Sequence, residues 1–179
     1  MTVGLKNSEF EDVFSTMTNG NGEYFLEAKP EYYPFMYAVK EYGENFLEYW
    51  RHDISLTDDI VINARVDKLK LYGLHCFKIR GAYPALTIYF RPMCLAKYKA
   101  GEEDIAPDLS PAMDQVSVNG RRVAVFLLNK VEEFAGDRNM TAYLMQVSRP
   151  SEFLPQGENF LHVHVVDEFG HVGEASLYF

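Results

Sequence analysis

This sequence of 179 residues lacks most of the signatures that tie a chain to a particular chemistry. It has two cysteines, one tryptophan, and no apolar run near the ~20 residues that span a bilayer. It also contains no glycine-rich phosphate loop, no G-x-S-x-G nucleophile turn and no internal repeat. These absences remove the usual anchors for nucleotide binding, serine catalysis and membrane insertion. We expect no cofactor and identify no small-molecule substrate.

The two cysteines and the N-terminus bear on the cellular location. Cys76 and Cys94 lie in segments with strand-like alternation, where buried thiols are more common than a disulfide or a nucleophile. No charged leader followed by an apolar run marks an N-terminal signal. We therefore expect a cytoplasmic or virion protein that folds as a single domain over residues 1–179 without a disulfide.

The C-terminal stretch from Gly157 to Phe179 has the clearest pattern in the chain. Two runs of alternating apolar and polar residues flank the turn sequence Asp-Glu-Phe-Gly, which predicts a β-hairpin. If both apolar rows share a face, the loop has an odd number of residues, most simply Asp167 to His171. The predicted cross-strand pairs are Leu161 with Leu177, Val163 with Ala175, and His164 with Glu174.

The same stretch resembles the last two strands of immunoglobulin-like sandwich repeats. In those repeats a P-x-G-x-N lead-in precedes alternating valines, a D-x-x-G turn and a last strand that begins near a small residue. The corresponding residues here are Pro155, Gly157, Asn159, Val163, Val165, Asp167, Gly170 and Ala175. The resemblance implies an antiparallel β-sandwich and no particular activity, because such repeats mostly serve adhesion, spacing and assembly.

The first third of the chain predicts helices. Ser8 and Glu11 form a capping box, and the apolar residues after it recur at helical spacing, which predicts a helix over residues 9–17. A second apolar stripe, from Phe35 to Trp50, predicts another helix with Gly43 inside it.

The remainder of the chain predicts strands. Alternating apolar residues run through residues 59–99, and the Asn-Gly pair at 119–120 suits a type I′ turn between two further strands. Residues 101–112 are acidic and aperiodic, which predicts a loop. The expected fold is mainly β with two N-terminal helical segments (α+β). Residues 1–52 form the helical part, packed on an immunoglobulin-like antiparallel β-sandwich over residues 53–179.

The net charge of −9 is unevenly distributed along the chain. Residues 1–59 hold 12 acids and 4 bases, residues 60–100 hold 1 acid and 8 bases, and residues 101–179 hold 13 acids and 5 bases. A basic middle between acidic flanks either neutralises itself within the fold or attracts a neighbouring copy. The simplest explanation is a strand face of solvated lysines.

Strand parity assigns the basic residues to one face. Apolar residues at odd positions from Leu69 to Ile79 form the buried row, and His75 falls on it. Lys68, Lys70 and Lys78 fall on the opposite face, and they are the candidate residues of a protein interface.

One motif suggests a metal site. His162 and His164 share a strand face, and Glu174 is predicted opposite His164, which gives three ligands for zinc or a similar ion. No fourth ligand is identifiable, and the alternative is a pair of ordinary surface histidines. The neighbours His75 and Cys76 do not form a base and nucleophile, because successive strand residues point to opposite faces.

We therefore expect a non-enzymatic structural or assembly protein. It would bind other protein subunits, copies of itself or others, and its expected setting is a viral or phage particle, as a capsid, neck or tail component. A first alternative is an acidic inhibitor that occupies the nucleic-acid site of a host protein, and a second is a metal-dependent enzyme built on the H-x-H strand. Nucleic acid is not an expected partner, because the acidic flanks repel phosphate.

Overall fold

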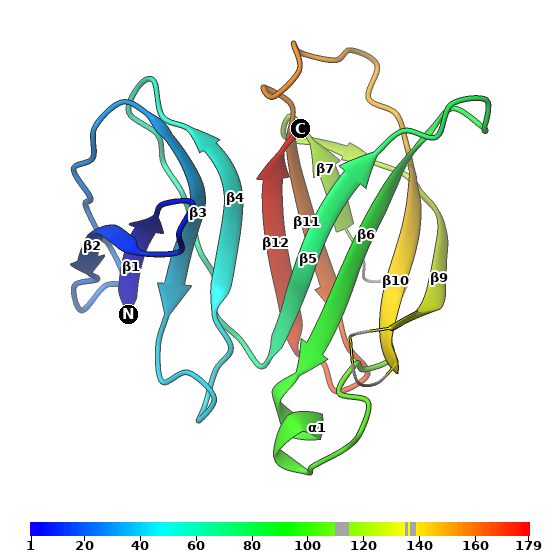
Figure 1. Cartoon of the computed structure of the whole chain (residues 1–179), viewed down its shortest axis with the longest axis horizontal. Coiled ribbons are helices and arrows are strands. Elements are labelled where there is room, and N and C mark those ends of the chain that lie inside the picture. Colours follow the sequence, from blue (N-terminus) through cyan, green and yellow to red (C-terminus); the bar gives the residue numbers. More distant parts are fainter. Residues whose placement is uncertain (110–114, 135, 137–138) are drawn as a thin grey trace.

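A computed structural model describes residues 1–109, 115–134, 136 and 139–179, which form two β-sheets (Figure 1). The eight-stranded sheet has the order β2-β1-β3-β4-β12-β11-β7-β8. Its strands are β1 (Thr2–Lys6), β2 (Asp12–Met17), β3 (Tyr32–Val39), β4 (Tyr49–Ser55), β7 (Gln115–Val118), β8 (Arg121–Val123), β11 (Phe160–Val166) and β12 (Val172–Tyr178). The mainly β class is thereby confirmed.

The four-stranded sheet has the order β5-β6-β10-β9. Its strands are β5 (Leu69–Phe77), β6 (Ala85–Cys94), β9 (Val125–Phe134) and β10 (Asn139–Ser148). The helix α1 (Leu95–Lys99) follows β6 directly. No helix in the described part of the chain has the length and apolar character to cross a membrane.

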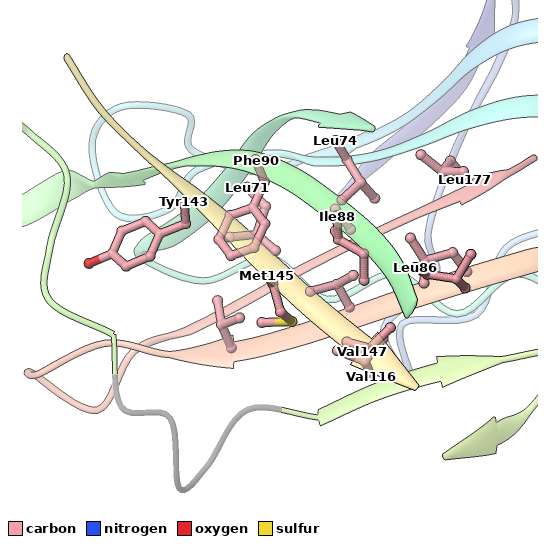
Figure 2. Close-up of a cluster of buried hydrophobic side chains, with 14 of the residues drawn as sticks. Leu71, Leu74, Leu86, Ile88, Phe90, Val116, Tyr143, Met145, Val147 and Leu177 are labelled. Atoms are coloured by element: carbon pink, nitrogen blue, oxygen red, sulfur yellow. The ribbon is translucent and has the colours of Figure 1, made fainter. Parts of the chain in front are cut away.

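The small sheet packs on β7, β11 and β12 to form a sandwich whose core consists of alternate residues from both layers. Phe90 and Tyr143 lie side by side in this core (Figure 2), and their rings stack with centroids 5.9 Å apart. Met145 and Leu161 are completely buried. Burying a side chain of this size contributes about 1.5–3 kcal/mol relative to leaving it in water.

The eight-stranded sheet continues past the sandwich, through β4, into the N-terminal strands. In the parallel pairing of β4 with β12, Arg51 lies beside Ser176, and on the other side of β4 Arg51 lies opposite Met36. Paired residues share a face and successive residues alternate, so Met36 points away from the face of Ala175 and Leu177. The two hydrophobic cores therefore lie on opposite faces of one sheet.

The second core covers β1, β3 and β4. It consists of Val3, Leu5, Tyr33, Met36, Ala38, Tyr49 and Ile54. Two extended segments close it with alternate residues, which are Tyr24, Leu26 and Ala28 in the first and Ile62, Ala64 and Val66 in the second. The Tyr24 hydroxyl donates a 2.7 Å hydrogen bond to the Ile62 carbonyl and so joins the two segments.

The predicted helix over residues 9–17 is wrong. The capping-box residue Glu11 donates its backbone N–H to Asn7 Oδ1 at 2.8 Å within a turn, and β2 follows. Of the apolar residues at helical spacing, Phe14 packs against the second core, whereas Met17 is 65% exposed. Hydrogen bonds to β1 pair the backbone groups of this segment as a β-strand, so the pairing overrides the helical spacing of its apolar residues.

The predicted helix from Phe35 to Trp50 is also wrong. This range contains most of β3, a turn and the start of β4. Glu41 and Gly43 have φ angles of 45° and 73°, a left-handed conformation that reverses the chain and has no place inside an α-helix. The helical part expected over residues 1–52 is therefore four β-strands, of which β4 runs on to Ser55.

Two details of the predicted strands also change. The alternating residues 60–66 form no strand, because they serve as the cover of the second core. In β5, a bulge with Gly73 at φ 58° shifts the register between Tyr72 and His75. Beyond the bulge Leu74 is buried, and His75 is exposed instead of belonging to the core.

Both predicted hairpins are confirmed. Leu161 pairs with Leu177, Val163 with Ala175 and His164 with Glu174, and the loop is Asp167 to His171. The Asn-Gly pair at 119–120 has φ angles of 52° and 75° and joins β7 to β8. Residues 101–109 form the expected loop, with one bridge between Leu109 and Asp167. Residues 110–112 of that loop lie outside the described residues.

Candidate functional site

The predicted metal ligands His162, His164 and Glu174 lie on the outer face of the final hairpin, opposite the sandwich core. His164 lies directly opposite Glu174, whereas His162 lies opposite Ser176. The donor atoms of His162, His164 and Glu174 do not converge within 4.8 Å of one another. Among the described residues, another set of three does so, and it is described below. Burial lowers the pKa of His162, and Glu174 partly opposes this. Metal binding by these three residues would require side-chain rotation and stays a prediction.

A buried guanidinium lies at the junction of β4 with the hairpin. Arg51 is 6% exposed, and its guanidinium carbon lies 4.4 Å from the Phe160 ring centroid and 5.1 Å from that of Tyr178. It donates a 2.7 Å hydrogen bond to the Tyr178 hydroxyl, while its Nε has no partner among the described residues. Two aromatic faces and one hydroxyl therefore hold this charge, and they tie β4 to β11 and β12.

The three candidate interface lysines have different surroundings. Lys68 is exposed, and Lys78 Nζ lies 3.6 Å from the centroid of the Phe153 ring. Lys70 is 3% exposed and forms an ion pair with Glu48. Burial lowers the pKa of Lys70 to about 8, although Glu48 acts in the opposite direction. The expectation that Lys70 faces solvent is wrong, because the residues around β4 cover this part of β5.

Other bases of the middle segment also contact acids of their own chain. Arg91 Nε lies 3.7 Å from Glu133 Oε2, and Lys97 Nζ lies 2.8 Å from Glu102 Oε2. With Lys70, these pairs link the basic segment to both acidic flanks. The arrangement favours neutralisation within the fold over attraction between copies, although each exposed pair contributes little stability.

The described residues contain one converging set of possible metal ligands, formed by Cys94, Asp167 and His171. One donor atom from each residue lies within 4.8 Å of the other two. Cys94 is the last residue of β6, and Asp167 and His171 bound the loop between β11 and β12. Cys94 and the Asp167 carboxyl group are fully buried, while the His171 side chain is 19% exposed.

The hairpin loop holds the two loop residues in place. Asp167 Oδ1 accepts hydrogen bonds from the N–H groups of Phe169 and His171, at 2.9 and 2.8 Å. Its Oδ2 lies 3.0 Å from His171 Nδ1. The third residue, Cys94, is fixed by a 2.9 Å hydrogen bond from its N–H to the Ile105 carbonyl. All three residues are thus positioned by backbone contacts.

Cysteine nucleophile chemistry does not fit this cluster. Burial raises the pKa of the Cys94 thiol, Asp167 adds to the effect, and the amides of Lys97 and Ala96 oppose it. A reactive cysteine needs both thiolate character and access, and Cys94 is 0% exposed. The second thiol, Cys76, has a pKa raised to about 12 by burial. The sequence pattern missed the cluster because Cys94 and Asp167 are 73 positions apart in the sequence.

A hollow of ≈ 400 Å³ lies beside α1. Its walls are formed by Tyr42, Gly43, Glu44, Leu47, Met93, Cys94, Leu95 and Tyr98. Most of the lining residues are apolar, and Glu44 has no second carboxylate or histidine beside it in the lining to act as an acid–base partner.

Strand β9 forms an open edge of the small sheet. Its ten residues pair with β10 on one side and with no strand of the described chain on the other. Phe126, Leu127 and Phe134 on this strand are 49%, 42% and 70% exposed. Long edges with exposed apolar residues are sites where another strand can pair.

In comparisons with known proteins, no family model, no curated protein and no solved structure matches this chain. Its function is therefore argued from geometry.

Proposed function

We propose that this chain is a non-enzymatic assembly subunit, an immunoglobulin-like β-sandwich that pairs with a second copy of itself along β9. The immunoglobulin-like type is supported by the final hairpin and its lead-in. A particle of viral or phage origin is the setting that we propose for it. The observation that carries the assembly role is the open edge of β9, which is the longest edge strand without a second partner among the described residues.

The other edges are less suited to pairing. β8 has three residues and carries Arg121 and Arg122, and short charged edges resist addition of a strand. β5 is interrupted in its middle by the bulge at Gly73, whereas the bulge of β9 lies at its start, between Val125 and Leu127. β2 has six residues, four fewer than β9.

The sequence of β9 is complementary to itself in one antiparallel register. With a two-fold axis at Val131, Lys130 of each copy lies opposite Glu132 of the other, and Leu128 lies opposite Phe134. A shift of the axis to Lys130 would place two lysines opposite each other, which is unfavourable. The Lys130–Glu132 attraction therefore favours the register centred on Val131.

Lys130, the lysine of this edge strand, already has an ion-pair partner in its own chain. Lysines on edge strands often prevent pairing by keeping a charge in the way. The Lys130 ammonium forms an ion pair with Asp108 of its own chain, on the loop that precedes β7. The positive charge is thus held near the strand, where it can also attract Glu132 of a second copy.

Charge reversal tests the proposal. We expect the parent protein to self-associate in light scattering coupled to size-exclusion chromatography, and Glu132→Lys to weaken the association. Each of the two symmetric pairs loses an attraction of about 0.5 kcal/mol and gains a repulsion of about 0.5 kcal/mol, which totals ~2 kcal/mol, or about 30-fold in Kd. The double variant Lys130→Glu/Glu132→Lys should recover most of the loss.

Lys68→Glu is the matched control, because it reverses one exposed charge directly before β5, away from β9. If Lys68→Glu weakens association and Glu132→Lys does not, the interface lies on the basic segment and the β9 proposal is wrong. A parent that remains monomeric at high micromolar concentration also overturns it.

A further inference from the structure

The geometry points to a zinc site formed by Cys94, Asp167 and His171, which we propose binds one Zn²⁺ and clasps the C-terminal hairpin to the corner between β6 and α1. This inference is independent of the assembly role, and it departs from the expectation that the protein has no cofactor. It also places the metal away from His162 and His164, which lie on the outer face of the sheet.

The donor set is one that zinc prefers. Thiolate, imidazole and carboxylate are its usual protein ligands, whereas Mg²⁺ and Ca²⁺ favour oxygen alone. Binding replaces the proton of the Cys94 thiol by the metal and releases that proton to solvent. One thiolate and one carboxylate then balance the charge of Zn²⁺, so the buried site becomes neutral.

The distance between the donor atoms of His171 and Asp167 is close to that in a tetrahedral zinc site. Bonds of about 2.0–2.1 Å from zinc to nitrogen and oxygen imply an N···O separation of roughly 3.3 Å between two ligands. His171 Nδ1 and Asp167 Oδ2 are 3.0 Å apart, and Cys94 Sγ lies within 4.8 Å of one donor atom of each of these residues. Shifts of a few tenths of an ångström bring the first two into place.

Hydrogen bonds from the backbone already orient the Asp167 carboxylate, which is one of the proposed ligands. Asp167 Oδ1 is occupied by the N–H groups of Phe169 and His171, which leaves Oδ2 for the metal. Hydrogen bonds of this kind orient ligands in zinc sites. Three protein ligands leave a fourth position for water, and the partial exposure of His171 provides access to it.

The location gives the site a structural role. Leu109 pairs with Asp167, and Glu168 donates its N–H to the Asp108 carbonyl at 2.9 Å. The loop 101–109, the end of β6 and the final hairpin therefore meet at this point. A metal bound here would join the end of β6 directly to the final hairpin, 73 positions further along the chain, beside the loop 101–109.

The experiment uses the 179-residue protein made in zinc-supplemented medium without chelators. We expect elemental analysis after dialysis to find one zinc per chain, and Co²⁺ added to the metal-free protein to give a thiolate-to-cobalt charge-transfer band. Cys94→Ser should abolish this band, while the control Cys76→Ser should retain it. Zinc should raise the thermal midpoint of the parent and leave that of Cys94→Ser unchanged.

Other outcomes overturn the proposal. The proposal is overturned if the parent protein contains no zinc and gives no cobalt–thiolate band. It is also overturned if the band persists in Cys94→Ser. Loss of zinc in His162→Ala with retention in His171→Ala would place the metal on the outer strand face. If Cys94→Ser does not fold, the cobalt band in Cys76→Ser decides the question, because Cys94 is then the one remaining thiol.

Discussion

The hydroxyl groups of Tyr49 and Ser176 lie 2.9 Å apart in a buried hydrogen bond between residues 127 positions apart in sequence. The bond joins β4 to β12, which pair through two residue pairs, Arg51 with Ser176 and His52 with Leu177. It therefore reinforces a short seam between the N-terminal strands and the sandwich.

Removal of either hydroxyl should destabilise the protein. We expect Tyr49→Phe and Ser176→Ala each to lower the free energy of unfolding by about 1–2 kcal/mol, because each leaves a buried polar group without its partner. The double variant should lose less than the sum of the two, as measured by urea denaturation. Strictly additive losses would show that the two hydroxyls do not interact.

The buried Lys70 should make the free energy of unfolding depend on pH in the alkaline range. Its pKa in the folded protein is about 8, against 10.5 for the ordinary side chain. Between these values the unfolded chain binds more protons, so the free energy of unfolding rises with pH, by up to ~2 kcal/mol between about pH 8 and 9.5. Burial raises the pKa of tyrosines such as Tyr33, which reverses the trend above about pH 10.

Variants identify the source of this slope. Glu48→Gln/Lys70→Met removes both members of the ion pair and should flatten the rise between about pH 8 and 9.5 in urea titrations. Lys68→Met, at an exposed lysine two residues away, should keep it. Lys70→Glu, in contrast, places two acids together and should cost about 3–5 kcal/mol at neutral pH. An unchanged slope in the double variant would assign the rise to another group.

Asn159 should be among the most sensitive polar positions. It is 4% exposed, its Oδ1 accepts the N–H of Leu154 at 2.9 Å, and its Nδ2 donates to the Leu154 carbonyl at 2.9 Å. We expect Asn159→Ala to lower the free energy of unfolding by about 2–4 kcal/mol, because both backbone partners lose a hydrogen bond in a part-buried turn. Asn45→Ala, which removes an exposed hydrogen bond to the Glu41 carboxylate, is the control and should cost less than about 0.5 kcal/mol. Equal costs would contradict the assignment of Asn159 as the centre of this turn.

Gly173 should not accept a side chain. A Cβ on Gly173 would lie 2.9 Å from Leu69 Cγ, between the two layers of the sandwich. Gly173→Ala should therefore destabilise the fold by about 1–3 kcal/mol through overpacking. Gly20→Ala is the control, since nothing lies within 4 Å of its Cβ position, and it should change stability by less than about 0.5 kcal/mol. Thermal unfolding of the two variants measures the difference.

Local pattern was sufficient where strand partners are adjacent in sequence. The final hairpin was predicted with its register and loop, because a period-two apolar row and a five-residue turn leave few alternatives for Val163 and Ala175. The Asn-Gly turn was predicted for the same reason.

Local pattern failed where a distant strand decided the outcome. Phe14 and Met17 have helical spacing, yet β1 and the second core make the segment a strand. Gly43 looked like a defect in a helix and is instead part of the turn that reverses the chain.

The sequence by itself determined the mainly β class, the C-terminal hairpin and the outward position of His162 and His164. These follow from side-chain alternation and turn chemistry, which act over a few residues. Tertiary structure alone decided that Lys70 is buried beside Glu48, that Cys94 meets Asp167 and His171, and that two cores lie on opposite faces of one sheet. Each of these depends on which strands become neighbours, and that choice is made by the packing of the whole chain.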